Sequence, residues 1–250
     1  MTNRSRPKHV PAPRSKLATR VEIPASRAED YERAINCVER LGPWSTSHPI
    51  SDWIDAARTV SGWLRGATQP SAPTSDRGSV LSFLANTCVP AMRLCRLCWA
   101  LENAGRLENA GLVVKEMQGN PVAFRHAVFV LYVGVKIALV THRTVRAIPT
   151  GNEKAPDLAV PSENLAIECK AHEGLAMKES LRDGIGHASE KLQGTYRGWF
   201  GCAAIDLGVV ESGTMQIEGR PLLNLADYEA DLGKQFSIFP SVRACVVLAS

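Results

Sequence analysis

The chain has 250 residues, of which 45% are hydrophobic and 22% are charged, so it is long and apolar enough to bury a core. This composition excludes collagen, a continuous coiled coil and a wholly disordered chain. The formal net charge is +4, but residues 1–20 contain six basic residues and no acid, so the remainder is close to neutral.

The basic segment, residues 1–22, contains three prolines and no apolar run, which predicts a disordered tail rather than a signal peptide. Such a tail could contact the phosphates of nucleic acid, or it could serve only to keep the protein soluble. The seven cysteines form no disulfide framework, which predicts reduced thiols and a cytoplasmic location. Cys95 and Cys98 are predicted to be core thiols rather than zinc ligands, because no second pair of ligands follows them.

Residues 23–119 are predicted to form a helical region. Ser26 with Glu29 suggests a helix N-terminus, and apolar residues recur at helical spacing in three segments, 26–41, 50–66 and about 79–104. The pentapeptide LENAG occurs at 101–105 and again at 107–111, and both copies are interpreted as a helix end with its glycine cap.

Residues 120–250 have a different pattern, in which short β-rich runs alternate with helical spacing. The order predicts an α/β domain with a mixed central sheet flanked by helices. Helices are expected at 121–140, 178–197 and 221–236, and strands at 143–150, 156–160, 165–170, 199–208 and 243–248. The first of these helices opens at Pro121 and includes charged residues, which predicts a core helix rather than a membrane span.

Two carboxylates and a lysine are predicted to converge within residues 156–170. Glu168 and Lys170 are two apart in a strand and therefore share a face, which we expect to be open to solvent. The turn at 161–164 folds the preceding strand back, so that Asp157 lies near them. Carboxylates and a backbone carbonyl suit Mg²⁺ or Mn²⁺, and a nearby ammonium can activate water or offset charge on phosphate.

These residues resemble the motif of the PD-(D/E)xK nuclease superfamily, the restriction-endonuclease-like fold. Pro156 and Asp157 match its first half, and Glu168, Cys169 and Lys170 match its second. A chain of this composition would contain the joint pattern roughly 0.02 times by chance. The resemblance also covers the helix and strand before the motif and the helix and strand after it.

The resemblance implies that Asp157, Glu168 and Lys170 are catalytic and that Asp157, Glu168 and the Cys169 carbonyl bind the metal. On the same basis, Lys191, Gln193 and His172 are candidates for contacts with nucleic acid. Many members carry a further acid on the first helix, but residues 121–142 contain none. His126 and His142 flank that helix and are interpreted as capping or hydrogen-bonded groups.

The expected function is a metal-dependent nuclease that acts on DNA, of a restriction, repair or defence type, working as a homodimer or in a larger complex. No membrane partner is expected. The alternative is a catalytically silent module that kept the fold and binds nucleic acid or a protein. The lack of an acidic residue on the helix within residues 121–142 favours the silent module, whereas the intact set of Asp157, Glu168 and Lys170 favours the enzyme.

Overall fold

A computed structural model describes most of the chain downstream of the basic tail. Its described residues are 27–45, 47–66, 84–148, 155–171, 177–192, 194–208, 216–217, 220–221 and 226–249. The predicted tail, residues 1–22, lies outside them. Three helices at the N-terminal side pack against one another, with a π-helical turn (Leu84–Cys88) leading into the third. They are α1 (Ala28–Glu39), α2 (Ile50–Leu64) and α4 (Val89–Glu102).

The start of α1 differs from the prediction. Arg27 is the N-cap, and its backbone N–H donates to the Asp30 carboxylate at 3.2 Å. The acid that closes the first turn is therefore Asp30 and not Glu29. The early acids still favour this end of the helix, because the exposed N–H groups carry partial positive charge there.

The two copies of LENAG adopt different structures, so their common interpretation as helix ends is wrong for the second copy. The first copy ends α4 and enters a 3₁₀ turn (Ala104–Arg106). The second forms strand β1 (Leu107–Glu108) and the start of helix α5 (Ala110–Gly119). Leu107 is buried and β1 pairs with the main sheet, so tertiary contacts rather than the local sequence decide the conformation.

The described chain is α/β, with a mixed six-stranded sheet flanked by helices, as the sequence predicted. The strand order is β1-β2-β3-β4-β5-β8. Strand β3 runs antiparallel to both neighbours, and the other neighbouring pairs are parallel. The strands after β1 are β2 (Val145–Ala147), β3 (Leu158–Val160), β4 (Leu165–Ala171), β5 (Phe200–Gly208) and β8 (Val242–Ala249), and β6 (Gln216–Ile217) with β7 (Arg220–Pro221) forms a separate ribbon.

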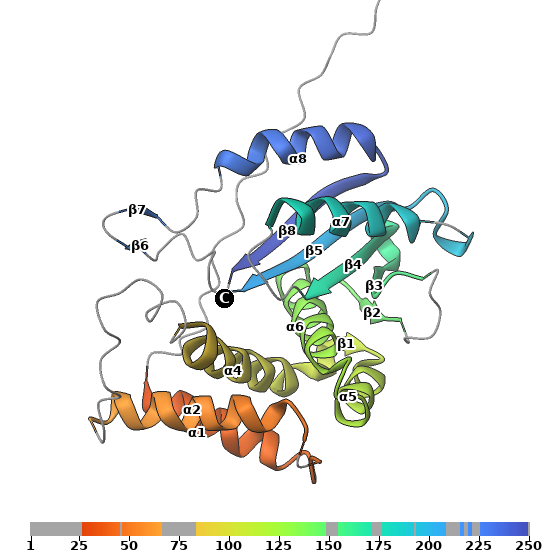
Figure 1. Cartoon of the computed structure of the whole chain (residues 1–250). Helices are drawn as coiled ribbons and strands as arrows, with labels where there is room; N and C mark the ends of the chain where they lie inside the picture. Colours follow the sequence, from red (N-terminus) through yellow and green to blue (C-terminus); the bar gives the residue numbers. More distant parts are fainter. Residues whose placement is uncertain are drawn as a thin grey trace, which may run out of the picture.

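Helices cover both faces of the sheet (Figure 1). On one face, Ile167 and Cys169 of β4 join the core that includes α6 (Phe124–Thr141). On the other face, Ala203 and Ile205 of β5 pack with residues of α7 (Met177–Glu190) and α8 (Ala226–Ile238). The central parallel strands are therefore buried on both sides, as is usual for such strands.

Helix α6 is the central helix of the core. It begins at Phe124 rather than at the predicted Pro121, because the Asn120 side chain accepts hydrogen bonds from the N–H groups of Val122 and Ala123 and holds the preceding residues in a turn. Within the described residues, α6 alone is long and apolar enough for a membrane span, with a mean hydropathy of 1.6. However, 61% of it is buried inside the protein, in contact with α4, α5 and the sheet.

One hydrophobic core joins the N-terminal helices to the sheet. It extends from Tyr31 in α1 through α6 to Ala204 in β5. The seven cysteines are free thiols, and Cys95 and Cys98 are buried in this core. The predicted boundary between the helical region and the α/β domain, at residues 119 and 120, falls between α5 and α6, and these two helices pack against each other.

Candidate active site

The β3–β4 hairpin forms the centre of the candidate site, with the antiparallel pairing that the sequence predicted. Leu158 pairs with Ile167, and Val160 pairs with Leu165. A 3₁₀ turn (Pro161–Glu163) connects the strands, followed by Asn164 with a φ of 47°. Asparagine tolerates this left-handed conformation better than most residues, which explains how so short a turn reverses the chain.

Asp157 is fixed at the open end of this hairpin. Its Oδ2 accepts a hydrogen bond of 2.7 Å from the backbone N–H of Cys169, and its backbone carbonyl accepts one of 2.9 Å from the N–H of Ile148. The side chain therefore spans from the start of β3 to β4, and the backbone is tied to the end of β2. Asp157 thus lies beside the strand that carries Glu168 and Lys170.

Glu168 is buried, which corrects the expectation that its face of the strand is open to solvent. Only 7% of the residue is exposed, because α7 covers the face of β4 that the hairpin alone would leave open. Its Oε2 is buried without a hydrogen-bond partner in the described part of the chain. A carboxylate oxygen in such a position is costly unless a donor or a cation satisfies it.

The electrostatic surroundings of Glu168 keep its proton bound to unusually high pH. Burial and the negative charge of Asp157 raise the pKa of Glu168 to about 7, although Lys191, His126 and Lys170 act in the opposite direction. A carboxyl group whose pKa is raised by burial and by a neighbouring carboxylate is a common feature of functional sites.

His126 of α6 is an unexpected member of the site. Its Nε2 lies 3.1 Å from Asp157 Oδ1. Burial lowers the pKa of His126, but the hydrogen bond to Asp157 and the charges of Asp157 and Glu168 outweigh burial, so that the pKa is raised overall. Asp157 is therefore held between the imidazole and the Cys169 N–H, one partner at each carboxylate oxygen.

The two candidate lysines approach Glu168 from different elements. Lys170 is half-buried on β4, and its side chain lies close to Gly184 of α7, where an added Cβ would come within 3.9 Å of Lys170 Cγ. Lys191 follows α7 directly, and its positive charge acts to lower the pKa of Glu168. The other two candidates for nucleic-acid contacts, His172 and Gln193, lie outside the described residues.

The oxygen ligands that these residues offer suit a divalent cation whose remaining ligands come from water or substrate. Throughout the described ranges, no three His, Cys, Asp or Glu side chains form a metal-binding group, so the protein would supply two carboxylates. The Cys169 N–H points toward Asp157, and in a strand the carbonyl of a residue leaves on the same edge as its N–H. Asp157, Glu168 and the Cys169 carbonyl therefore fit Mg²⁺ or Mn²⁺, and the unsatisfied Glu168 Oε2 is consistent with that fit.

His126 is the functional residue whose role the sequence did not reveal. The sequence indicated only a capping or hydrogen-bonded group, and the hydrogen bond is present. A stronger signal was available, because His126 is a titratable residue in a mainly apolar helix, in the element where the resemblance expects an acid.

Comparison of the chain with models of known protein families, with curated proteins and with solved structures finds no match.

Proposed function

We propose that the protein is a metal-dependent nuclease with a restriction-endonuclease-like core, which hydrolyses phosphodiester bonds in nucleic acid, with DNA as the substrate. The main supporting observation is the placement of Asp157 against β4, through its hydrogen bond to the Cys169 N–H, beside a buried Glu168 with an unsatisfied oxygen. A surface hairpin with an ordinary Glu–Lys pair would not bury a carboxylate next to a second carboxylate.

The order of elements around the motif supports the same proposal. Helix α6 and strand β2 precede Pro156, and helix α7 and strand β5 follow Lys170. This is the arrangement that the resemblance to PD-(D/E)xK nucleases implies on either side of the motif.

Each side chain has a defined task in the proposed reaction. Asp157, Glu168 and the Cys169 carbonyl hold the cation, which supplies Lewis-acid polarisation of the phosphate when it is bound. His126 and the Cys169 N–H fix the orientation of the Asp157 carboxylate. The Lys170 ammonium offsets the negative charge that develops on the phosphate in the transition state, and it can assist the attacking water.

The second candidate function is a catalytically silent module of the same fold that binds nucleic acid or a protein. One observation favours it. Helix α6 contributes His126 to the site where the family pattern would supply a third carboxylate, so the described residues provide few negative charges for a cation.

Cleavage assays with matched variants test the proposed function. The purified protein is incubated with DNA and with RNA in Mg²⁺, in Mn²⁺ and in chelator, and metal binding is measured by calorimetry. Lys170→Ala should abolish cleavage and keep metal binding, whereas Asp157→Ala should lose both. Glu163→Ala is the control on the same hairpin, because its side chain is 48% exposed and pairs with Arg143.

Equal cleavage by wild type and Lys170→Ala would show that the site is wrongly assigned. Absence of cleavage of every nucleic acid with every metal would favour the silent module. Cleavage of RNA but not DNA would keep the site and correct the substrate.

A further inference from the structure

Two thiols from different helices lie together among the N-terminal helices. They are Cys37 of α1 and Cys98 of α4, and the two helices pack against each other. Both thiols are free. Neither cysteine belongs to the metal-binding set, so an inference about them does not rest on the proposed nuclease activity.

The contacts between α1 and α4 place the Cys98 sulfur beside Cys37. Cys95 Sγ lies 3.9 Å from the carbonyl oxygen of Asp30. Three residues further along both helices, Cys98 Sγ lies 4.0 Å from the carbonyl oxygen of Arg33. The two helices therefore run side by side in the same direction. In an α-helix the carbonyl of residue 33 faces the N–H of residue 37, so the Cys98 sulfur lies beside the turn that ends at Cys37.

The two thiols differ in exposure and in the nearest charge. Cys98 is only 4% exposed, whereas Cys37 is half-buried and can be reached from solvent. Glu102 Oε1 lies 3.7 Å from Cys98 Sγ and also accepts a hydrogen bond of 2.8 Å from Arg33 Nε. A carboxylate next to a thiol favours the protonated form of that thiol, so the proton shared by the pair belongs on Cys98.

The electrostatic surroundings favour a thiolate at Cys37. A hydrogen bond from Cys98 lowers the pKa of Cys37 below that of an ordinary thiol, although burial and the charge of Glu102 act to raise it. The guanidinium groups of Arg33 and Arg40 also lower the pKa of Cys37. The same hydrogen bond, together with burial, raises the pKa of Cys98. An accessible thiolate with a protonated thiol behind it is the arrangement of an attacking and a resolving cysteine.

We propose that Cys37 and Cys98 form a peroxide-responsive dithiol, in which oxidation joins α1 to α4 through a disulfide. The Cys37 thiolate attacks one oxygen of hydrogen peroxide, the O–O bond breaks, and the released hydroxide takes up a proton as water. Cys37 is then a sulfenic acid. The Cys98 sulfur attacks the Cys37 sulfur, the S–O bond breaks, and the hydroxide leaves with the Cys98 proton as a second water.

The two thiols thus lose two electrons, and the peroxide that accepts them becomes two waters. In a reducing compartment a disulfide of this kind is transient, which is the behaviour of a redox-sensing site.

Peroxide treatment of the full-length protein followed by mass spectrometry tests the proposal. Remaining thiols are blocked with iodoacetamide after unfolding, and the digested protein is searched for disulfide-linked peptides. We expect a Cys37–Cys98 link that dithiothreitol reverses. Cys98→Ser keeps a hydroxyl that can donate a hydrogen bond, and it should leave Cys37 as a sulfenic acid that dimedone traps. Cys37→Ser should leave Cys98 reduced.

Cys88 is the matched control, because it is also half-buried but burial raises the pKa of its thiol. In the wild-type protein at neutral pH, iodoacetamide should alkylate Cys37 about tenfold or more faster than Cys88. This measurement needs no variant, so it holds even if a substituted protein does not fold. Cys88→Ser should leave the disulfide unchanged.

Three results would overturn the proposal. They are the absence of a Cys37–Cys98 link after peroxide treatment of the folded protein, equal alkylation rates for Cys37 and Cys88, and failure of dimedone to label Cys37 in a folded Cys98→Ser variant.

Discussion

Glu168 shows how the surroundings of a single residue change its chemistry. A glutamate on an open strand face would be ionised well below neutral pH, whereas burial and Asp157 raise the pKa of Glu168 to about 7. In the absence of metal, the site therefore takes up a proton near neutrality. Binding of a divalent cation would compete with that proton, so metal affinity should increase as the pH rises through 7.

The raised pKa of Glu168 predicts how stability depends on pH. Between the ordinary glutamate pKa of 4.5 and about 7, the folded protein keeps a proton that the unfolded chain releases, so stability falls as pH rises across this window. Glu168→Gln removes this loss. We expect it to stabilise the metal-free protein at pH 8 by about 1–3 kcal/mol and to have little effect at pH 4.5.

Urea unfolding in chelator at the two pH values measures this effect. Glu163→Gln on the same hairpin is the matched control and should change little at either pH, since its side chain is exposed. A Glu168→Gln variant with no gain at pH 8 relative to pH 4.5 would contradict the assignment of a buried, protonated carboxyl.

His126 should make stability depend on pH in the same direction as Glu168, because the pKa values of both groups are raised in the folded protein. Its pKa is raised in the folded protein, so the contact with Asp157 stabilises the fold fully below the ordinary histidine pKa of 6.5 and is lost as pH rises through the folded value. We expect His126→Asn to destabilise the protein more at pH 5.5 than at pH 8.5. His142→Asn, at an exposed position, should show no such difference. Equal losses for His126→Asn at both pH values would exclude a charged imidazole.

At the scale of elements, the packing of α7 on the sheet sets the environment of the candidate site. Gly184 allows the close approach, because a Cβ there would lie 2.7 Å from Ile205 Cδ1 and 3.1 Å from Ile205 Cγ1. Ile205 is fully buried and has little room to move. The same helix covers Glu168 and lies against the stem of Lys170.

Gly184→Ala should therefore destabilise the fold by about 1–3 kcal/mol through overpacking, although alanine favours helices. Gly233→Ala on α8 is the control, since nothing lies within 4 Å of the added Cβ, and we expect it to stabilise by about 0.5–1 kcal/mol. Thermal unfolding of both variants measures the contrast. A stabilising Gly184→Ala would mean that α7 is not packed this closely.

The sequence predicted many of these elements, but it missed those that depend on distant contacts. Periodicity located α2, β4, β5 and β8 to within a few residues, because each has an apolar pattern of its own, whereas α7 ends at Glu190 rather than at the predicted residue 197. The sequence did not predict strand β1 or helix α5. A strand of two residues carries no periodic signal, and β1 forms only because it pairs with β2. The sequence correctly predicted that Asp157 lies beside β4. It could not show that α7 would bury Glu168 or that α6 would place His126 next to Asp157.

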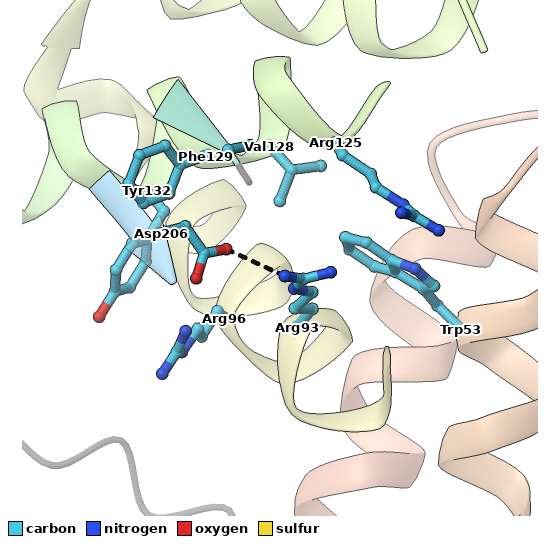
Figure 2. Close-up of a pocket in the computed structure, with 9 residues that line it drawn as sticks. Trp53, Arg93, Arg96, Arg125, Val128, Phe129, Tyr132 and Asp206 are labelled. Atoms are coloured by element: carbon cyan, nitrogen blue, oxygen red, sulfur yellow. Dashed lines mark hydrogen bonds and ion pairs between the residues drawn. The ribbon is translucent and has the colours of Figure 1, made fainter. Parts of the chain in front are cut away.

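At the scale of the whole molecule, helix α6 connects the candidate active site to the N-terminal helices. His126 contacts Asp157 on the side of the candidate active site, and the adjacent Arg125 lines a small void together with Trp53 of α2 and Arg93 of α4 (Figure 2). Successive residues of a helix point about 100° apart, so one helix can serve both places. The continuous core from α1 to β5 holds this helix between the N-terminal helices and the sheet.

The span of chain that each contact must close has a consequence for the time course of folding. The hydrogen bond from Cys169 to Asp157 joins residues 12 apart in the chain, whereas the ion pair between Arg93 and Asp206 joins residues 113 apart. Longer loops cost more entropy to close, so hairpin contacts can form well before the parallel strands associate. In pulse-labelling hydrogen exchange during refolding, the Cys169 amide should gain protection before that of Gly201, which bonds to Ser241 far along the chain. The two carboxylates would thus be adjacent in an early intermediate, before Arg93 pairs with Asp206.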